Sequence, residues 1–233
     1  MMSLTESLGG KATLLRNTDN LLIDLDGTLV DSMDCLRSTY FAFLSRFEKT
    51  GSLAEFSSLI GPPLKAVVIA LKHNHGLEQD VDELSRIYGE IMERNYELCQ
   101  PLAGARELLE SAGNAGKQLA LVTGAHSETA GNLVSRLDWR GFFNVVITGD
   151  LCRDHKPDPE PYQKAMSALG ASADNCLVIE DSENGIRSAC AAGIETIGLC
   201  RESDRNTLIK AGARYCFEDL EALASALKRA WEI

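Results

Sequence analysis

Short apolar segments alternate with amphipathic segments along most of this chain. Five apolar segments are rich in Leu, Val and Ile and have the length of buried parallel strands. These five are residues 21–25, 118–123, 144–148, 176–180 and 195–199. Amphipathic segments with helical spacing lie between and after them. They include residues 128–137, 159–169, 182–192 and 220–231. This alternation predicts an α/β fold whose core is a doubly wound, Rossmann-like parallel sheet.

The segment at residues 33–98 differs, because it shows no convincing strand and its apolar residues repeat at helical spacing. A Gly-Pro-Pro sequence at residues 61–63 divides this segment, since proline stops a preceding helix. We therefore expect an all-helical cap domain at residues 33–98, inserted into an α/β core domain formed by residues 14–32 and 99–233.

Composition and charge narrow the range of partners. The hydrophobic fraction of 45% and the charged fraction of 24% are typical of a globular protein. The net charge of -11 leaves no basic surface for nucleic acid or anionic lipid, and no run of 18 apolar residues occurs. We expect no nucleic acid and no membrane partner, a small-molecule substrate, and a monomer or homodimer.

The seven cysteines are widely scattered and include no C-x-x-C pair. They are Cys35, Cys99, Cys152, Cys176, Cys190, Cys200 and Cys216. This usage predicts reduced, mostly buried thiols in a cytoplasmic protein.

The most informative stretch is the first apolar segment, which ends in Asp24 and Asp26. Alternation along an extended backbone directs both carboxylates to one side, and two clustered acids there suit a hard cation such as Mg²⁺. Gly27 allows a tight turn directly afterwards. Taken alone, this D-x-D pair is equally typical of a solvated Asp-Gly turn.

The complete string at residues 24–32, D-L-D-G-T-L-V-D-S, resembles motif I of the haloacid dehalogenase superfamily. Three later segments resemble the other motifs of that family in order. Thr123 ends a strand as in motif II, Lys156 begins K-P-D-P-E-P-Y as in motif III, and residues 180–181 follow a strand as in motif IV. The resemblance extends from Asn20 to the C-terminus. It departs from the common pattern at Gly124 and His155.

The resemblance implies a catalytic role for four residues. Asp24 is expected to be the nucleophile that attacks phosphorus, and Asp26 the acid that protonates the leaving group and then activates water. Thr123 and Lys156 are expected to bind the phosphoryl oxygens and neutralise their charge. Asp26 also argues against dehalogenases, because these lack an acid two residues after the nucleophile.

The resemblance further implies a magnesium site and a substrate site. The expected metal residues are Asp24, Asp26, Glu180 and Asp181. Asp181 is expected to bind Mg²⁺ directly, and Glu180 either directly or through water. The expected substrate-binding residues are Thr28, Gly124, His126 and Lys65.

A helical cap after motif I resembles phosphoglycolate phosphatases, β-phosphoglucomutases and phosphonoacetaldehyde hydrolases. The G-P-P-L segment at residues 61–64 favours a phosphoglycolate-like or sugar-phosphate-like monoester. The predicted function is a Mg²⁺-dependent phosphatase that forms an aspartyl-phosphate. Alternatives are a β-phosphoglucomutase-like transferase, a phosphonoacetaldehyde hydrolase with Lys65 as Schiff-base lysine, and a non-catalytic binding protein of the same fold.

Overall fold

The computed structural model describes residues 18–59, 64–200 and 205–231. The chain separates into two compact units, one formed by residues up to Asp31 and from Pro101 onward, the other by Ser32–Gln100. We name the first the core unit and the second the cap unit. The G-P-P part of the predicted G-P-P-L segment lies outside the described residues.

Within the described residues, the core unit is built on a six-stranded sheet in the order β5-β4-β1-β6-β7-β8, with every neighbouring pair parallel. Its strands are β1 (Asn20–Ile23), β4 (Gln118–Val122), β5 (Val145–Ile147), β6 (Cys176–Glu180), β7 (Glu195–Leu199) and β8 (Tyr215–Phe217). All residues of β1 and β6 are buried, because helices cover both faces of a parallel sheet.

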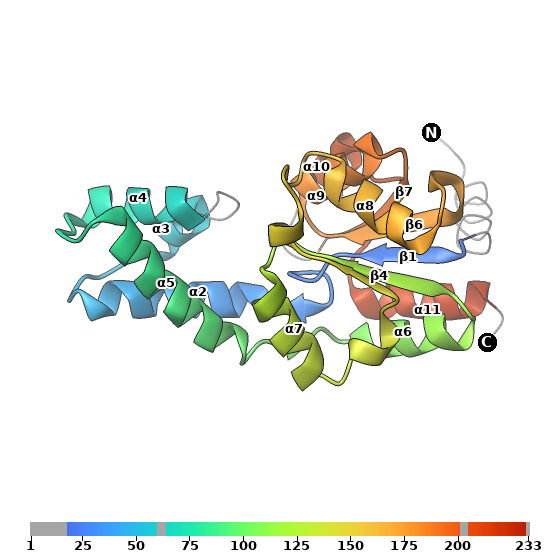
Figure 1. Ribbon diagram of the computed structural model, residues 1–233, viewed down its shortest axis with the longest axis horizontal. Coiled ribbons are helices and arrows are strands. Elements are labelled where there is room, and N and C mark those ends of the chain that lie inside the picture. The colour runs from blue at the N-terminus through green and yellow to red at the C-terminus, as the bar shows by residue number, and fades with distance from the viewer. Residues whose placement is uncertain (1–17, 60–63, 201–204, 232–233) are drawn as a thin grey trace. The chain divides into compact units, whose positions relative to one another are not determined.

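Helices flank this sheet on both sides. They are α6 (Ala105–Asn114), α7 (Ser127–Arg136), α8 (Glu160–Leu169), α9 (Glu183–Ala191), α10 (Arg205–Ala211) and α11 (Leu220–Ala230), with 3₁₀ turns η1 (Arg140–Phe142), η2 (Gly149–Leu151) and η3 (Ala173–Asn175). Figure 1 shows α8, α9 and α10 on one face of the sheet and α6 and α11 on the other. The predicted doubly wound, Rossmann-like α/β fold is confirmed.

The strand order brings predicted site residues together at the carboxyl edge of the sheet. From β1 the chain builds β4 and β5 outward on one side, then β6, β7 and β8 outward on the other. In this arrangement the carboxyl ends of β1, β4 and β6 meet at a topological switch point, where open α/β sheets bind ligands. Asp24, Thr123 and Asp181 each follow one of these three strands directly.

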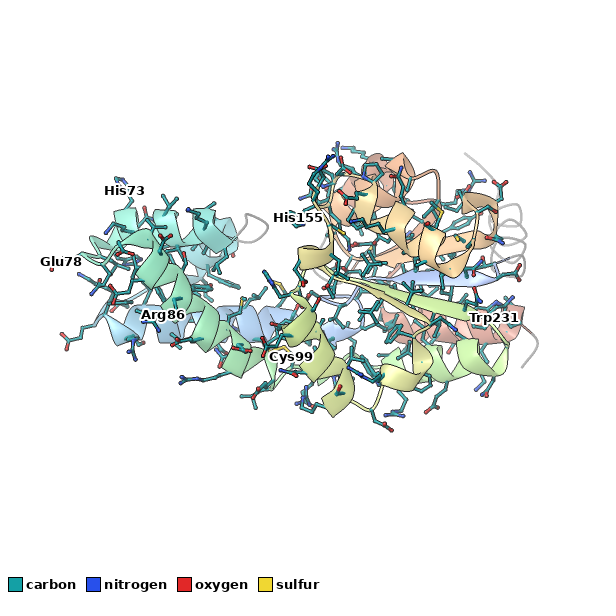
Figure 2. All side chains as sticks on the ribbon, viewed as in Figure 1. His73, Glu78, Arg86, Cys99, His155 and Trp231 are labelled. Atoms are coloured by element: carbon teal, nitrogen blue, oxygen red, sulfur yellow. A yellow bond between two sulfur atoms is a disulfide. The ribbon has the colours of Figure 1, made fainter. Side chains whose placement is uncertain are left out.

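The cap unit is helical and has an apolar core of its own. Its helices are α2 (Ser32–Arg46), α3 (Leu53–Ser58), α4 (Leu64–His75) and α5 (Val81–Tyr96). Six fully buried side chains anchor that core, namely Tyr40, Phe43, Leu44, Val68, Leu71 and Leu84. In Figure 2 His73, near the end of α4, points away from these helices. The all-helical character expected for this segment is present.

Three short strands were not predicted. β8 has three residues, of which Cys216 is buried while Tyr215 and Phe217 are half-buried, so no hydrophobic period identifies it. β2 (Val30–Asp31) and β3 (Gln100–Pro101) form a separate two-stranded ribbon. Two residues per strand are too few to produce any alternation.

The prediction of seven thiols is wrong for Cys35 and Cys99, which form a disulfide with a Cα–Cα distance of 6.2 Å. Figure 2 labels Cys99 at the end of the cap unit. The two residues are 64 positions apart, so only the antiparallel return of the chain through α2 and α5 makes them neighbours. The other five cysteines are not part of a disulfide. No helix in the described ranges is long and apolar enough to span a bilayer.

Candidate active site

β1 delivers Asp24 to the carboxyl end of the sheet, where the chain turns sharply. The Asp24 N–H donates to the Ile179 carbonyl oxygen at 3.1 Å, which extends the pairing of β1 with β6 by one residue. Gly27 has a φ of +82°, in the left-handed region that favours glycine, and a Cβ at this position would overlap the Asp181 carboxylate. Glycine is therefore required for the turn to pack against Asp181.

Lys156 links three strands of the sheet at this edge. Its Nζ donates to Asp24 Oδ1 at 2.7 Å, to Glu180 Oε1 at 2.7 Å and to the Val122 carbonyl oxygen at 2.9 Å. The Lys156 side chain is 14% exposed and the Asp24 side chain 9% exposed. The structure thus brings together Lys156 and Asp24, which are 132 residues apart in the sequence.

Glu180 is fully buried and both of its oxygens are occupied by donors. Oε1 accepts from Lys156 Nζ and, at 2.9 Å, from the Tyr162 hydroxyl. Oε2 accepts from the backbone N–H groups of Asp181 and Ser182 and from the Ser182 hydroxyl, all between 3.0 and 3.2 Å. This set of donors fixes the Glu180 carboxylate and, through it, the Lys156 ammonium. Motif reading gave no role to Tyr162 or Ser182.

The Asp26 side chain faces the strand that carries motif II. Thr123 Oγ1 donates to Asp26 Oδ2 at 3.3 Å and accepts from the Ala125 N–H at 3.0 Å. Thr28, fully buried, has its Oγ1 3.5 Å from Asp181 Oδ1, at the long limit of a hydrogen bond. Thr123 therefore contacts Asp26, and Thr28 lies beside Asp181.

Negative charge exceeds positive charge in this cluster. Carboxylate oxygens of Asp24, Glu180 and Asp181 lie within 4.8 Å of one another, and Lys156 is the cation that pairs with two of them. Burial first, then the Glu180 charge, raises the pKa of Asp181 to about 8. Burial also raises the pKa of Asp24 well above its usual value, although Lys156 opposes it. Each raised pKa means that ionising the carboxylate costs free energy unless additional positive charge lies nearby.

The same contacts act on the lysine in the opposite sense. Burial lowers the pKa of Lys156, but the charges of Asp24 and Glu180 outweigh burial and raise that pKa well above its usual value. Lys156 is therefore held as a cation against Asp24. Three mutually close carboxylates are the oxygen-rich donor set that a hard divalent cation prefers, so Asp24, Glu180 and Asp181 fit a metal site.

Three of the predicted substrate residues are not part of these contacts. Gly124 and His126 are exposed in the loop between β4 and α7, where His126 occupies the N-cap position of α7. Lys65 is exposed in the first turn of α4, within the cap unit. The Asp26 carboxylate does not belong to the group of three mutually close carboxylates. Its Oδ2 instead accepts a hydrogen bond from Thr123 Oγ1.

Comparison with known proteins agrees with this geometry. The haloacid dehalogenase-like hydrolase model matches residues 21–199. A phosphoglycolate phosphatase of Colwellia psychrerythraea is 30% identical over 224 residues, covering 92% of this chain and 99% of the relative. A phosphorylated carbohydrates phosphatase of Thermotoga maritima is 29% identical over 203 residues, covering 83% of this chain and 91% of the relative.

A solved structure from Thermotoga maritima, described as a candidate β-phosphoglucomutase, superposes with a TM-score of 0.82 at 26% identity. It covers 91% of this chain and 99% of its own. The family match includes all four segments that contribute Asp24, Thr123, Lys156 and Asp181. On these grounds the chain belongs to the haloacid dehalogenase-like hydrolase family.

Proposed function

We propose that this protein is a Mg²⁺-dependent phosphatase that hydrolyses a small phosphate monoester through a phosphoryl group on Asp24. One observation carries the proposal, namely the buried Asp24 carboxylate held at 2.7 Å by Lys156 beside two further carboxylates. A lysine paired in this way leaves surplus negative charge, which a divalent cation bound by these carboxylates would neutralise.

The chain's own residues define the first half of the reaction. An Asp24 carboxylate oxygen attacks phosphorus, forming an aspartyl-phosphate (an acyl phosphate) while the bond from phosphorus to the leaving oxygen breaks. Asp26 gives its proton to that leaving oxygen, and the alcohol departs. Lys156 neutralises charge on the transferred phosphoryl group, and the Thr123 hydroxyl donates a hydrogen bond to one of its oxygens.

The second half regenerates the enzyme. Asp26, now ionised, removes a proton from a water molecule whose oxygen attacks phosphorus, and the bond from phosphorus to Asp24 breaks. Inorganic phosphate and the free Asp24 carboxylate result. Mg²⁺ held by Asp24 and Asp181, with Glu180 through water and Asp26 nearby, would supply positive charge to the phosphoryl oxygens. Glu180 contributes most directly by fixing Lys156.

The proposed substrate is a small phosphorylated acid or sugar. Support comes from the two relatives, whose names state phosphoglycolate and phosphorylated carbohydrates as their substrates. Likeness to a candidate β-phosphoglucomutase supports a second function, in which a sugar hydroxyl replaces water in the second half-reaction. Isomerisation of a glucose phosphate without release of inorganic phosphate distinguishes that function from hydrolysis.

The test is release of inorganic phosphate from a panel of phosphorylated acids, sugars and nucleotides, with MgCl₂ or with EDTA. Asp24→Asn serves as the variant without a nucleophile, and we expect its turnover to fall by at least ~10⁴-fold. Release from wild type that needs neither Mg²⁺ nor Asp24 contradicts the proposal. If no monoester in the panel releases inorganic phosphate, the mutase becomes the favoured function.

The proposal also includes a cytoplasmic location and a monomeric or homodimeric state. Gel filtration with light scattering measures the state directly. Reducing compartments disfavour disulfides, so a Cys35–Cys99 bond found intact in protein alkylated at lysis contradicts the cytoplasmic location.

A further inference from the structure

Helix α7 begins directly after the loop at residues 123–126, which carries the motif II threonine, and its first turn lacks a local cap. The residue at its N-cap position, His126, makes no side-chain cap hydrogen bond. The first N–H groups of a helix have no partner within the helix, so they need an acceptor from elsewhere. An acceptor from another part of the chain can therefore take the place of a local cap at the start of α7.

Asp150, in turn η2 after β5, supplies that acceptor from 23 residues away. Its Oδ1 accepts from the Ser127 N–H at 2.8 Å and its Oδ2 accepts from the Ser127 hydroxyl at 2.7 Å. The Ser127 and Thr148 hydroxyl oxygens are 2.7 Å apart, and Thr148 is buried. A carboxylate at this position also interacts favourably with the positive end of the helix dipole.

The same turn contacts the backbone of the motif II loop itself. The Gly149 N–H donates to the Ala125 carbonyl oxygen at 2.9 Å. A Cβ placed on Gly149 would overlap the Gly124 carbonyl oxygen, although the backbone of Gly149 is not in the left-handed region. Only the absence of a side chain lets η2 lie this close to the loop.

Two independent contacts thus hold residues 123–127 from the same turn. Ser127 fixes the C-terminal end of the loop, and Ala125 is fixed in its middle. At the other end, the Thr123 N–H donates to the Ile147 carbonyl oxygen at 2.9 Å, immediately before Thr148. The loop that presents Thr123 to Asp26 is therefore set by the segment that follows β5.

We propose that Asp150 is a positioning residue for the phosphoryl-binding loop at residues 123–126, acting through Ser127, with Gly149 providing the close approach. This inference rests on the proposed phosphatase function. Asp150 itself touches no reacting atom. Its removal releases the start of α7, and the loop that carries the Thr123 hydroxyl then loses its alignment with Asp24 and Asp26.

The test compares Asp150→Ala, Asp150→Asn and Gly149→Ala in the full-length protein with MgCl₂. Misplacement of a binding group by a fraction of an ångström costs about 10-fold in turnover, so Asp150→Ala and Gly149→Ala should each lower kcat by about that factor. Asp150→Asn keeps one acceptor for the Ser127 N–H and should restore kcat to within about 3-fold of wild type. Binding of inorganic phosphate, measured by calorimetry, should weaken in the same order.

Asp219→Ala is the matched control. Asp219 is exposed and caps α11 through a hydrogen bond from the Ala222 N–H to its Oδ1 at 2.7 Å, remote from the motif II loop in the sequence. It should lower the midpoint of thermal unfolding as Asp150→Ala does, with kcat and phosphate binding unchanged. Equal loss of thermal stability in both variants with unchanged kcat and phosphate binding makes Asp150 a helix cap only and overturns the inference.

Failure of the proposed function gives a different result. If wild type binds inorganic phosphate but hydrolyses no monoester, the phosphatase proposal falls and the comparison of phosphate binding still decides the role of Asp150. If wild type neither binds phosphate nor releases it, both are overturned.

Discussion

Each unit of the molecule contains a carboxylate that accepts a hydrogen bond from a buried tyrosine, but the two clusters differ in charge balance. In the core unit the Tyr162 hydroxyl lies 2.9 Å from Glu180, and in the cap unit the Tyr40 hydroxyl lies 2.5 Å from Glu55. Around Glu55 every further partner is a donor, since His75 and Asn74 contact its oxygens at 2.8 to 3.1 Å. These donors satisfy the hydrogen-bonding capacity of the Glu55 carboxylate.

The core cluster gathers more acids than its donors neutralise. Asp24 and Asp181 lie close to Glu180, with Lys156 as the shared cation. The pKa values follow this difference. Burial raises the pKa of Glu55, but hydrogen bonds from Tyr40 and its other partners outweigh burial and lower it, whereas the pKa of Asp181 rises to about 8. A balanced cluster stabilises its fold, while an unbalanced one indicates a place where the protein binds something positive.

Among the substitutions that change the charge of these two clusters without removing the nucleophile, replacing Lys156 is expected to have the largest effect. Lys156→Ala removes the cation that contacts Asp24, so we expect kcat for phosphate release to fall by about 10²- to 10³-fold. Lys164→Ala is the control, because Lys164 forms an i,i+4 pair with Glu160 on α8 and is 42% exposed. Loss of activity in both variants to the same extent contradicts a specific role for Lys156.

Asp181→Asn should weaken Mg²⁺ binding but raise the free energy of unfolding when no metal is present. Loss of a ligand should raise the Mg²⁺ concentration needed for half-maximal activity by at least ~10-fold. In EDTA the variant should be more stable than wild type, by about 1–3 kcal/mol at pH 8 after allowance for solvent screening, because an ionised Asp181 opposes folding. Denaturant unfolding from pH 4 to pH 9 measures this difference.

The sign of that pH dependence follows from the raised pKa. The unfolded Asp181 ionises near pH 4 and the folded one near pH 8, so wild type loses stability relative to Asp181→Asn as pH rises between these values. The difference should level off above pH 8. A variant less stable than wild type, with an unchanged Mg²⁺ requirement, would assign Asp181 a structural role.

Glu55→Gln should have the smallest effect and the reverse sign. Its hydrogen bonds hold α3 and α4 of the cap unit together, so we expect the free energy of unfolding to fall by about 1–2 kcal/mol at pH 7. Because the pKa of Glu55 is lowered when folded, this advantage is complete above its usual value of 4.5 and declines as pH falls below it. A difference that grows on acidification contradicts this account. The Mg²⁺ requirement for turnover should stay unchanged.

The sequence predicts the sheet well where strands are long and apolar. The five predicted strands overlap β1, β4, β5, β6 and β7, because runs of Leu, Val and Ile buried on both faces are visible without any partner. β8 was not predicted because its three residues, of which only Cys216 is buried, are too few to show a hydrophobic period. The Cys35–Cys99 bond escapes because it depends on how two helices pack, which residue spacing does not encode.

In the candidate site, too, some features could be predicted from the sequence and others could not. Resemblance to motifs identified Asp24 and Lys156 as catalytic residues, and the structure shows that they contact each other at 2.7 Å. The contacts of Tyr162 and Ser182 with Glu180 arise between loops and helix ends whose side-chain directions no single-sequence pattern specifies. The contact of Asp150 with Ser127 is of the same kind, since it joins two loops after neighbouring strands of the sheet.

The proposed mechanism requires that Asp24 becomes phosphorylated during turnover. We would mix wild-type protein and its best substrate with MgCl₂, quench in acid within the turnover time, and analyse the peptides by mass spectrometry. A phosphoryl group is expected on the peptide that contains Asp24, and it should be absent in EDTA and in Asp24→Asn. Steady hydrolysis with no phosphoryl group on that peptide, or with one on a different residue, would contradict the account.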